Sequence, residues 1–269
     1  MTIIAASDFS ELAENAVDYA ADVARLVDGN LVVFHSFTLS IHAANSGISA
    51  EHFRELFEER KQRLKIRAKE LSETFGISVK HEISFAFVED ELKRLIEKYK
   101  ARLVVLGMNQ KSLEQDLLGN RTANMIKDLK IPILAVPQHA RFAGTKKLLF
   151  ACDVSREIPE KIWEKIKDAV MNLQGEVEIF SVNEKVEELQ AGTIRREQFN
   201  RNMGGINYLY KNVQSNDVIG EIEKEIMASD ADILIMVPQK YGFWESIVHR
   251  SKTREMASGL DIPLLSIPG

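Results

Sequence analysis

A pattern of strand, glycine-bearing loop, helix and strand occurs twice in this chain and limits its fold more than any other feature. The first occurrence, residues 101–137, opens with an apolar run that ends at Gly107. It continues through a polar loop to Gly119 and closes with a second apolar run between two prolines. The same order returns in residues 231–268. Open parallel sheets build phosphate sites in this way, because helix amides and the helix dipole point at the anion.

The two occurrences belong to a repeat that extends over the whole chain. Thr122 and Thr253 are 131 positions apart (253 − 122), and two pairs of prolines have the same spacing. A repeat in a fixed order indicates two copies of one domain. We therefore predict tandem domains at 1–140 and 145–269, each of a size that suits one hydrophobic core.

Apolar runs alternate with amphipathic segments in both copies. The run from Thr2 to Ser7 shows little alternation, as expected for a central strand that is covered on both faces. Residues 11–28 follow a helical period, and Ser10 suits the N-cap. Five strands alternating with four helices in each copy predict an α/β fold class with two open, mostly parallel, Rossmann-like sheets.

Composition excludes several classes of protein. The net charge of −5 and a pI of about 5.8 argue against non-specific binding to nucleic acid or anionic membranes. No apolar run approaches the roughly 18 residues of a membrane span, and the N-terminus does not resemble a signal peptide. The single cysteine, Cys152, fits a reducing cytoplasm and is expected to be a small buried hydrophobic residue. The histidines lack metal-ligand spacing, so no metal is expected.

Candidate site residues follow the predicted strands. Ligands of open α/β sheets bind outside the carboxyl ends of the strands. Asp8 follows the first strand, where its carboxylate would accept hydrogen bonds from a base amino group or a ribose hydroxyl, or would instead cap the next helix. His35 lies at the end of the second strand. Gly107 ends the fourth strand, where a missing side chain would leave the crevice open.

A second group of candidate residues opens the helix before the fifth strand: Gly119, Asn120, Arg121 and Thr122. Free amides, a capping Asn120 and the cation of Arg121 would suit a phosphate, although Gly119 and Asn120 are equally compatible with an ordinary helix start. The chain contains no glycine-lysine-serine/threonine phosphate loop, no paired acids for magnesium and no nucleophile elbow. We therefore expect no enzymatic activity.

These motifs resemble the universal stress protein family in its tandem form. The resemblance rests on residues 3–10, 103–107, 119–122 and 131–137, and it covers nearly the whole chain. It implies a cytoplasmic stress-response protein without catalytic turnover. It also implies that the fifth strands, which would otherwise be exposed edges, pair within one chain as an intrachain pseudo-dimer.

The glycine loop departs from the pattern of the family members that bind ATP. Those members carry glycine, two residues, glycine, nine residues, glycine and then serine or threonine. Here Gly107 matches the first glycine, Gln110 replaces the second, and only eight residues separate it from Gly119. Asn120 replaces the hydroxyl residue. The second copy is more degenerate, since Val237 replaces its first glycine, and we expect no nucleotide there.

Two functions stay open at this point. In the first, copy one binds ATP or AMP through Asp8, His35, Gly107, Gly119, Asn120, Arg121 and Thr122. In the second, the protein is a nucleotide-free stress-response scaffold that acts through protein partners as yet unidentified. Either function is compatible with a homodimer of pseudo-dimers. A third, an adenylating or ATP-hydrolysing enzyme, has the least support because the motifs for it are missing.

Overall fold

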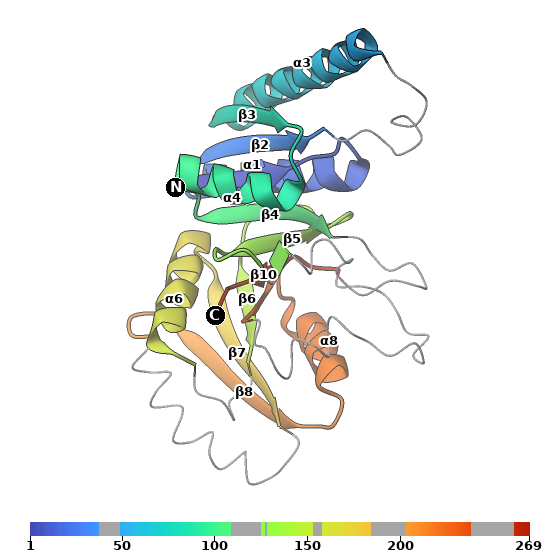
Figure 1. The fold of residues 1–269 in the computed structure, drawn as a ribbon. Helices are drawn as coiled ribbons and strands as arrows, with labels where there is room; N and C mark the ends of the chain where they lie inside the picture. Colours follow the sequence, from blue (N-terminus) through green and yellow to red (C-terminus); the bar gives the residue numbers. More distant parts are fainter. Residues whose placement is uncertain (38–48, 109–124, 127, 153–157, 184–202, 238–260) are drawn as a thin grey trace. The chain divides into compact units, whose positions relative to one another are not determined.

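The computed structural model describes residues 1–37, 49–108, 125–126, 128–152, 158–183, 203–237 and 261–269 (Figure 1). The chain divides into two compact units, Met1–Gly107 and Met108–Gly269. Both units contain helices and a largely parallel sheet, so the predicted α/β fold class is confirmed. The predicted boundaries of the two sequence copies, 1–140 and 145–269, stay a prediction.

The first unit is built around β1, which lies between β2 and β4. Its elements are β1 (Thr2–Ala6), α1 (Glu11–Leu26), β2 (Asn30–Ser36), α3 (Ala50–Phe75), β3 (Ser78–Ser84), α4 (Val88–Tyr99) and β4 (Leu103–Met108). The strands follow the order β3-β2-β1-β4, and every pair in this series is parallel (Figure 1). The centre of β1 is buried, as its uniformly apolar sequence predicted.

The second unit repeats this order and adds two strands, β10 and β5. Its elements are β5 (Ile133–Pro137), β6 (Lys147–Ala151), α6 (Glu160–Leu173), β7 (Glu176–Asn183), β8 (Tyr208–Gln214), α8 (Val218–Ser229), β9 (Ile233–Met236) and β10 (Leu264–Ser266). Strands β8-β7-β6-β9-β10 form a parallel series. The first four match the order β3-β2-β1-β4 of the first unit, as expected for a second copy of one domain.

Strand β5 is the fifth strand of the first sequence copy, and it pairs with the fifth strand of the second. It runs antiparallel to β10, with Leu134 opposite Leu265. All five residues of β5 are buried. The predicted intrachain pairing of the fifth strands is therefore confirmed. It also explains why β5 belongs to the second compact unit.

Helix ends follow local backbone chemistry, and two differ from the predictions. The Ser10 hydroxyl accepts a hydrogen bond from the Ala13 amide at 3.2 Å, which confirms Ser10 as the N-cap of α1. Helix α1 ends at Leu26 rather than at residue 28, because Asp28 has a left-handed φ of 48°. The sequence predicts a helix at roughly 157–173 with Pro159 in its first turn, whereas α6 begins at Glu160, because the extended ψ of 145° excludes Pro159 from the helix. The sequence also predicts a helix at 183–203, and that segment lies almost entirely outside the described residues.

Buried charges replace part of the apolar core in the second copy. Glu178 pairs with Leu149 in the second sheet, and Val32 pairs with Ile4 in the first. Leu149 and Ile4 are 145 positions apart (149 − 4), the same spacing as Asp153 and Asp8, which follow the first strand of each copy (153 − 8). Glu225 is the eighth residue of the twelve-residue helix α8, a position that an apolar leucine holds in α4. Both glutamates are buried, and each contacts a lysine: Lys147 Nζ lies 3.3 Å from Glu178 Oε2, and Lys211 contacts Glu225.

The remaining core is apolar, and Cys152 is buried in it as predicted. Within the described ranges, no helix has both the length and the apolar composition needed to cross a bilayer.

Candidate functional site

The carboxyl ends of β1, β2 and β4 form one edge of the first sheet. Parallel pairing sets Ala6 opposite Phe34 and Ala5 opposite Val105, so the residues that follow these positions lie at the same edge. Three of the predicted site residues are therefore brought to this edge: Asp8, His35 and Gly107. The other predicted site residues, Gly119, Asn120, Arg121 and Thr122, lie outside the described residues, as does Asp153 of the second copy.

Asp8 is exposed directly after β1 and takes part in a tight turn. Its Oδ1 accepts a hydrogen bond from the Ser10 amide at 3.0 Å, whereas the N-cap itself is Ser10. The alternative in which Asp8 caps the helix is therefore wrong, and one of its oxygens instead closes the turn that precedes α1. The other oxygen, Oδ2, has no hydrogen bond to any residue that the structure describes. Asp8 therefore presents a fixed carboxylate with one acceptor oxygen available to a ligand.

His35 is a buried, neutral ring behind the Asp8 turn. Its Nδ1 lies 2.8 Å from the carbonyl oxygen of Ser7. Because a carbonyl only accepts, Nδ1 carries the hydrogen and Nε2 has the lone pair. Burial lowers the pKa of His35, and the charges of Arg60 and Arg63 lower it further, against the opposing effects of Ser7 and Asp8. His35 is therefore uncharged at pH 7 and does not supply a cation for a phosphate.

Gly107 has a packing role that the sequence did not predict. A Cβ at this position would lie 2.7 Å from Cγ of Leu12, in the first turn of α1. The space left by the missing side chain is filled by Leu12, and it is not open as expected. The glycine therefore allows α1 to begin close against the end of β4.

Substitution of Gly107 by alanine is expected to lower the free energy of unfolding by about 1–3 kcal/mol, because the new methyl group must displace Leu12. Urea unfolding followed by circular dichroism measures this loss. Adding Leu12→Ala should restore part of it, since the smaller side chain makes room. If Gly107→Ala alone unfolds at the same urea concentration as the parent, Leu12 moves without cost and the packing role is wrong.

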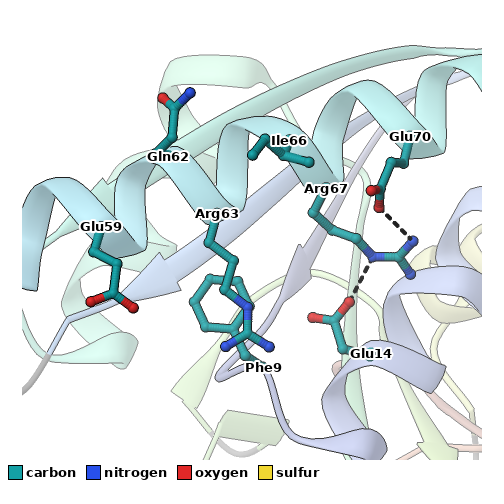
Figure 2. A pocket seen from close by; sticks show the side chains of 8 residues that line it. All are labelled: Phe9, Glu14, Glu59, Gln62, Arg63, Ile66, Arg67 and Glu70. Atoms are coloured by element: carbon teal, nitrogen blue, oxygen red, sulfur yellow. Dashed lines mark hydrogen bonds and ion pairs between the residues drawn. The ribbon is translucent and has the colours of Figure 1, made fainter.

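The turn after Asp8 is held in an uncommon conformation. Phe9 has a left-handed φ of 65°, which is unfavourable for a bulky side chain. Its amide donates a hydrogen bond to the Ser7 hydroxyl at 3.0 Å. One side of its ring contacts His35, with the ring centroids 4.6 Å apart. Cζ of Arg63 lies 4.3 Å from the ring centroid (Figure 2). These contacts fix the backbone that presents Asp8.

The sequence predicts a helix at about 50–75 whose charged side faces solvent, and this prediction missed the arginines of α3 that lie near the turn. Arg60 also faces the Phe9 ring, with its Cζ 5.9 Å from the ring centroid. Arg63 and Arg67 follow at helical spacing on the same side (Figure 2). That spacing of three and four residues is the signal that would have placed the arginines together.

Arg67 connects α3 to α1 through carboxylates. Its Nε donates to Glu14 at 2.7 Å, and its Nη2 donates to Asp18 at 2.5 Å. The Ser7 hydroxyl donates to the same Glu14 at 2.5 Å. Burial opposes the charge of Arg67, but the hydrogen bonds and charges of the two carboxylates outweigh it and raise the pKa. Arg67 is thus a structural cation whose contacts reach the end of β1.

A groove of about 570 Å³ lies between α3 and the start of α1 (Figure 2). It is lined by Phe9, Glu14, Glu59, Gln62, Arg63, Ile66, Arg67 and Glu70. The lining is mixed in charge. The described residues include no group of three or more histidine, cysteine or acidic side chains placed to hold a metal ion.

Comparison with known proteins identifies the family. The sequence profile of the universal stress protein family matches residues 1–137, which is half of the chain. The chain belongs to the universal stress protein family. Universal stress protein G of Escherichia coli O157:H7 is 31% identical over 135 residues, which cover 47% of this chain and 89% of that protein. A universal stress protein of Methanocaldococcus jannaschii is 27% identical over 139 residues, covering 50% of this chain and 80% of the relative.

Solved structures share the fold over both copies. The crystal structure of a universal stress protein from Archaeoglobus fulgidus DSM 4304 superposes with a TM-score of 0.75 at 17% identity. That comparison covers 99% of this chain and 98% of the other. A putative universal stress protein from Pseudomonas aeruginosa UCBPP-PA14 gives a TM-score of 0.58 at 14% identity, over 99% of this chain and 92% of the other. The tandem architecture of this universal stress protein therefore recurs in solved structures.

Proposed function

We propose that this universal stress protein binds an adenine nucleotide, ATP or AMP, in its first copy and does not turn it over. The observation that carries the proposal is the fixed, exposed carboxylate of Asp8 at the carboxyl edge of the sheet. In this proposal the protein acts in the cytoplasm as a nucleotide-responsive component of the stress response, without enzymatic activity.

The Asp8 turn suits the adenosine end of the ligand. With Oδ1 held by the Ser10 amide, Oδ2 is positioned to accept a hydrogen bond from a base amino group or a ribose hydroxyl. The contacts of Phe9 with Ser7 and His35 hold the turn before any ligand arrives. Such preorganisation reduces the entropy cost of binding. The family resemblance assigns the phosphate end to Gly119, Asn120, Arg121 and Thr122.

Nucleotide identification after purification tests this proposal. The full chain is purified without added nucleotide and denatured, and the released small molecules are identified by mass spectrometry. The parent is expected to release ATP, ADP or AMP close to one per chain, and Asp8→Ala is expected to release much less. Asp90→Ala is the matched control, because Asp90 is an exposed aspartate in the same unit and lies on α4. It should retain the parent's nucleotide content.

Thermal unfolding gives the second measurement. A ligand present at about 100 times its Kd stabilises the folded state by about 2.7 kcal/mol, so millimolar ATP should raise Tm clearly in the parent. An empty parent protein whose Tm does not respond to millimolar ATP, ADP or AMP would show that the nucleotide proposal is wrong.

A nucleotide-free scaffold is the second function that an observation favours. Phe85 and Phe87 are exposed between β3 and α4. Phe85 stacks on Phe53 and Phe57, with ring centroids 5.2 and 4.3 Å away, and so forms the outer part of an aromatic cluster. Exposed aromatic side chains of this kind suit a protein partner. Failure of the nucleotide test would make this surface the place to search.

A further inference from the structure

Two arginines near the Asp8 turn carry charges that the described fold does not neutralise. Arg60 and Arg63 of α3 face the Phe9 ring, at 5.9 and 4.3 Å from its centroid. Neither forms an ion pair with another residue in the described part of the chain. Arg67, one turn further along the same helix, contacts three carboxylates. The cations without a carboxylate partner are therefore the ones beside the candidate site.

We propose that Arg60 and Arg63 bind the phosphate groups of the nucleotide in the first copy. This inference rests on the proposed function and adds a phosphate-binding element on α3 that is separate from the glycine loop. A guanidinium that contacts a ring through its face keeps its N–H donors directed outward in the guanidinium plane. These donors form paired, charge-assisted hydrogen bonds with phosphate oxygens. Arg63 is exposed and Arg60 is half-buried, so both are accessible to a ligand.

The contacts with Phe9 place the arginines near Asp8, because Phe9 is the next residue along the chain. Burial is the main cause of the lowered pKa of His35; the charges of Arg60 and Arg63 lower it further and the charge of Asp8 opposes them, which agrees with this placement. A nucleotide whose adenosine contacts Asp8 therefore has both guanidinium groups within the same small region.

Any preference for an anion is local to these two side chains and does not come from the groove as a whole. Glu14 and Glu70 are both partnered by Arg67. The groove lining contains three carboxylates and two arginines, a net charge of −1 (2 − 3), and Arg60 beside it brings the sum to zero, so unpaired positive charge is present only at the side chains beside Phe9. His35 occupies one side of Phe9 and Arg63 lies near its ring, so the ring is not free to stack on a base. The group recognised here is thus the phosphate and not the base.

The altered glycine loop explains why phosphate binding in this chain would need additional cations. Gln110 replaces a glycine of the nucleotide-binding pattern, and the loop is one residue shorter than in the family members that bind ATP. Fewer backbone amides would then face the phosphates. Side-chain guanidinium groups are a substitute source of donors and of positive charge.

Calorimetric titration with three ligands tests the inference. The full chain and its Arg60→Gln/Arg63→Gln variant are titrated with ATP, AMP and adenosine at about 0.1 M salt. We expect ATP affinity to fall at least about tenfold, AMP affinity to fall less, and adenosine affinity to change less than about twofold, since charge-assisted hydrogen bonds are the strong ones. Lys61→Gln/Lys65→Gln is the matched control. It removes the same charge from exposed positions on α3 and should leave all three affinities within about twofold of the parent.

Each other outcome has a distinct meaning. If the parent binds ATP and the arginine variant binds it equally well, this inference is wrong while the proposed function stands. If all three ligands weaken equally, the arginines only support the Asp8 turn, and the inference is again wrong. If the parent binds none of the three, the proposed function fails and this inference fails with it. The Tm of each variant without ligand shows whether it is folded. If the double variant is unfolded, the test is repeated with the single variant Arg60→Gln, because Arg60 makes the longer contact with Phe9.

Discussion

Replacing Lys147 by methionine is expected to lower the free energy of unfolding by about 2–3 kcal/mol at pH 8 and by much less at pH 5. Lys147 Nζ lies 3.3 Å from the Glu178 carboxylate, whose side chain is 6% exposed. Removing the cation leaves a buried charge without its partner. The Lys147 side chain is 24% exposed, so we expect less than the roughly 3–5 kcal/mol that is typical of a fully buried pair.

The pH dependence follows from the direction of the Glu178 pKa. Burial raises this pKa, and a hydrogen bond with Glu225 raises it further, against the opposing effect of Lys147. A raised pKa means that the folded state holds the proton more tightly than the unfolded state. The resulting stability is fully present below the ordinary value of 4.5 and is lost as pH rises through the raised value. Removing Lys147 raises the pKa again, so a larger fraction of Glu178 is protonated at pH 5 than at pH 8, and the loss of the cation costs less there.

The measurement is urea unfolding of parent and variant at both pH values. Glu178→Gln provides the control background, because glutamine is a neutral side chain of nearly the same shape. In that background, Lys147→Met should cost little at either pH. A loss of equal size at pH 5 and pH 8 would show that the methylene groups of Lys147 stabilise the fold through packing, and the electrostatic account would be wrong.

Most strands and helices could be predicted because their signals are local. The uninterrupted apolar run of β1 and the helical period after Ser10 both lie within a few residues of the element that they specify. Helix ends were less accurate, because they depend on single backbone angles such as the left-handed φ of Asp28 and the extended ψ of Pro159. The pairing of β5 with β10 was predicted from the repeat and the family resemblance and not from either strand alone.

The candidate site could be predicted only where strand order determines it. Asp8 and His35 lie at one edge because the carboxyl ends of parallel strands coincide. The contact between Gly107 and Leu12 depends on how closely a helix approaches a strand, and no local pattern reports that distance. Arg60 and Arg63 were assigned to solvent for the same reason. Their spacing identifies one side of a helix but not the Phe9 turn that this side meets some fifty residues away in the sequence.

The buried charges of the second copy also could not be predicted, because they depend on contacts between elements that are distant in the sequence. In sequence, Glu178 is one of two acidic residues in a strand that otherwise reads as apolar, and Glu225 lies in a strongly charged helix. Only the strand register and the packing of α8 bring the two carboxyls together. Their first-copy counterparts are apolar, so the repeat predicts the position of these residues but not their chemistry.

Replacing Leu134 or Leu265 by alanine is expected to lower the free energy of unfolding by about 2–4 kcal/mol in each case. The two side chains are 1% and 3% exposed, and the residues stand opposite each other in the antiparallel pair of β5 and β10. Truncation removes buried methyl groups and leaves a cavity that the flanking strands cannot close. Leu209→Ala is the control, because Leu209 is 62% exposed on β8 and its truncation should change stability by less than about 0.5 kcal/mol.

A double-mutant cycle then tests whether the two copies of the domain stabilise each other. Directly opposed residues in a strand pair have Cβ atoms about 4.5–5.5 Å apart, so Leu134 of the first copy and Leu265 of the second should share one contact. The double variant should therefore lose less stability than the sum of the single variants, by at least about 0.5 kcal/mol. Additive losses would show that each leucine packs only within its own copy. A measurable coupling would mean that the fused arrangement stabilises both copies, because neither fifth strand can be truncated without weakening the contact that the other makes.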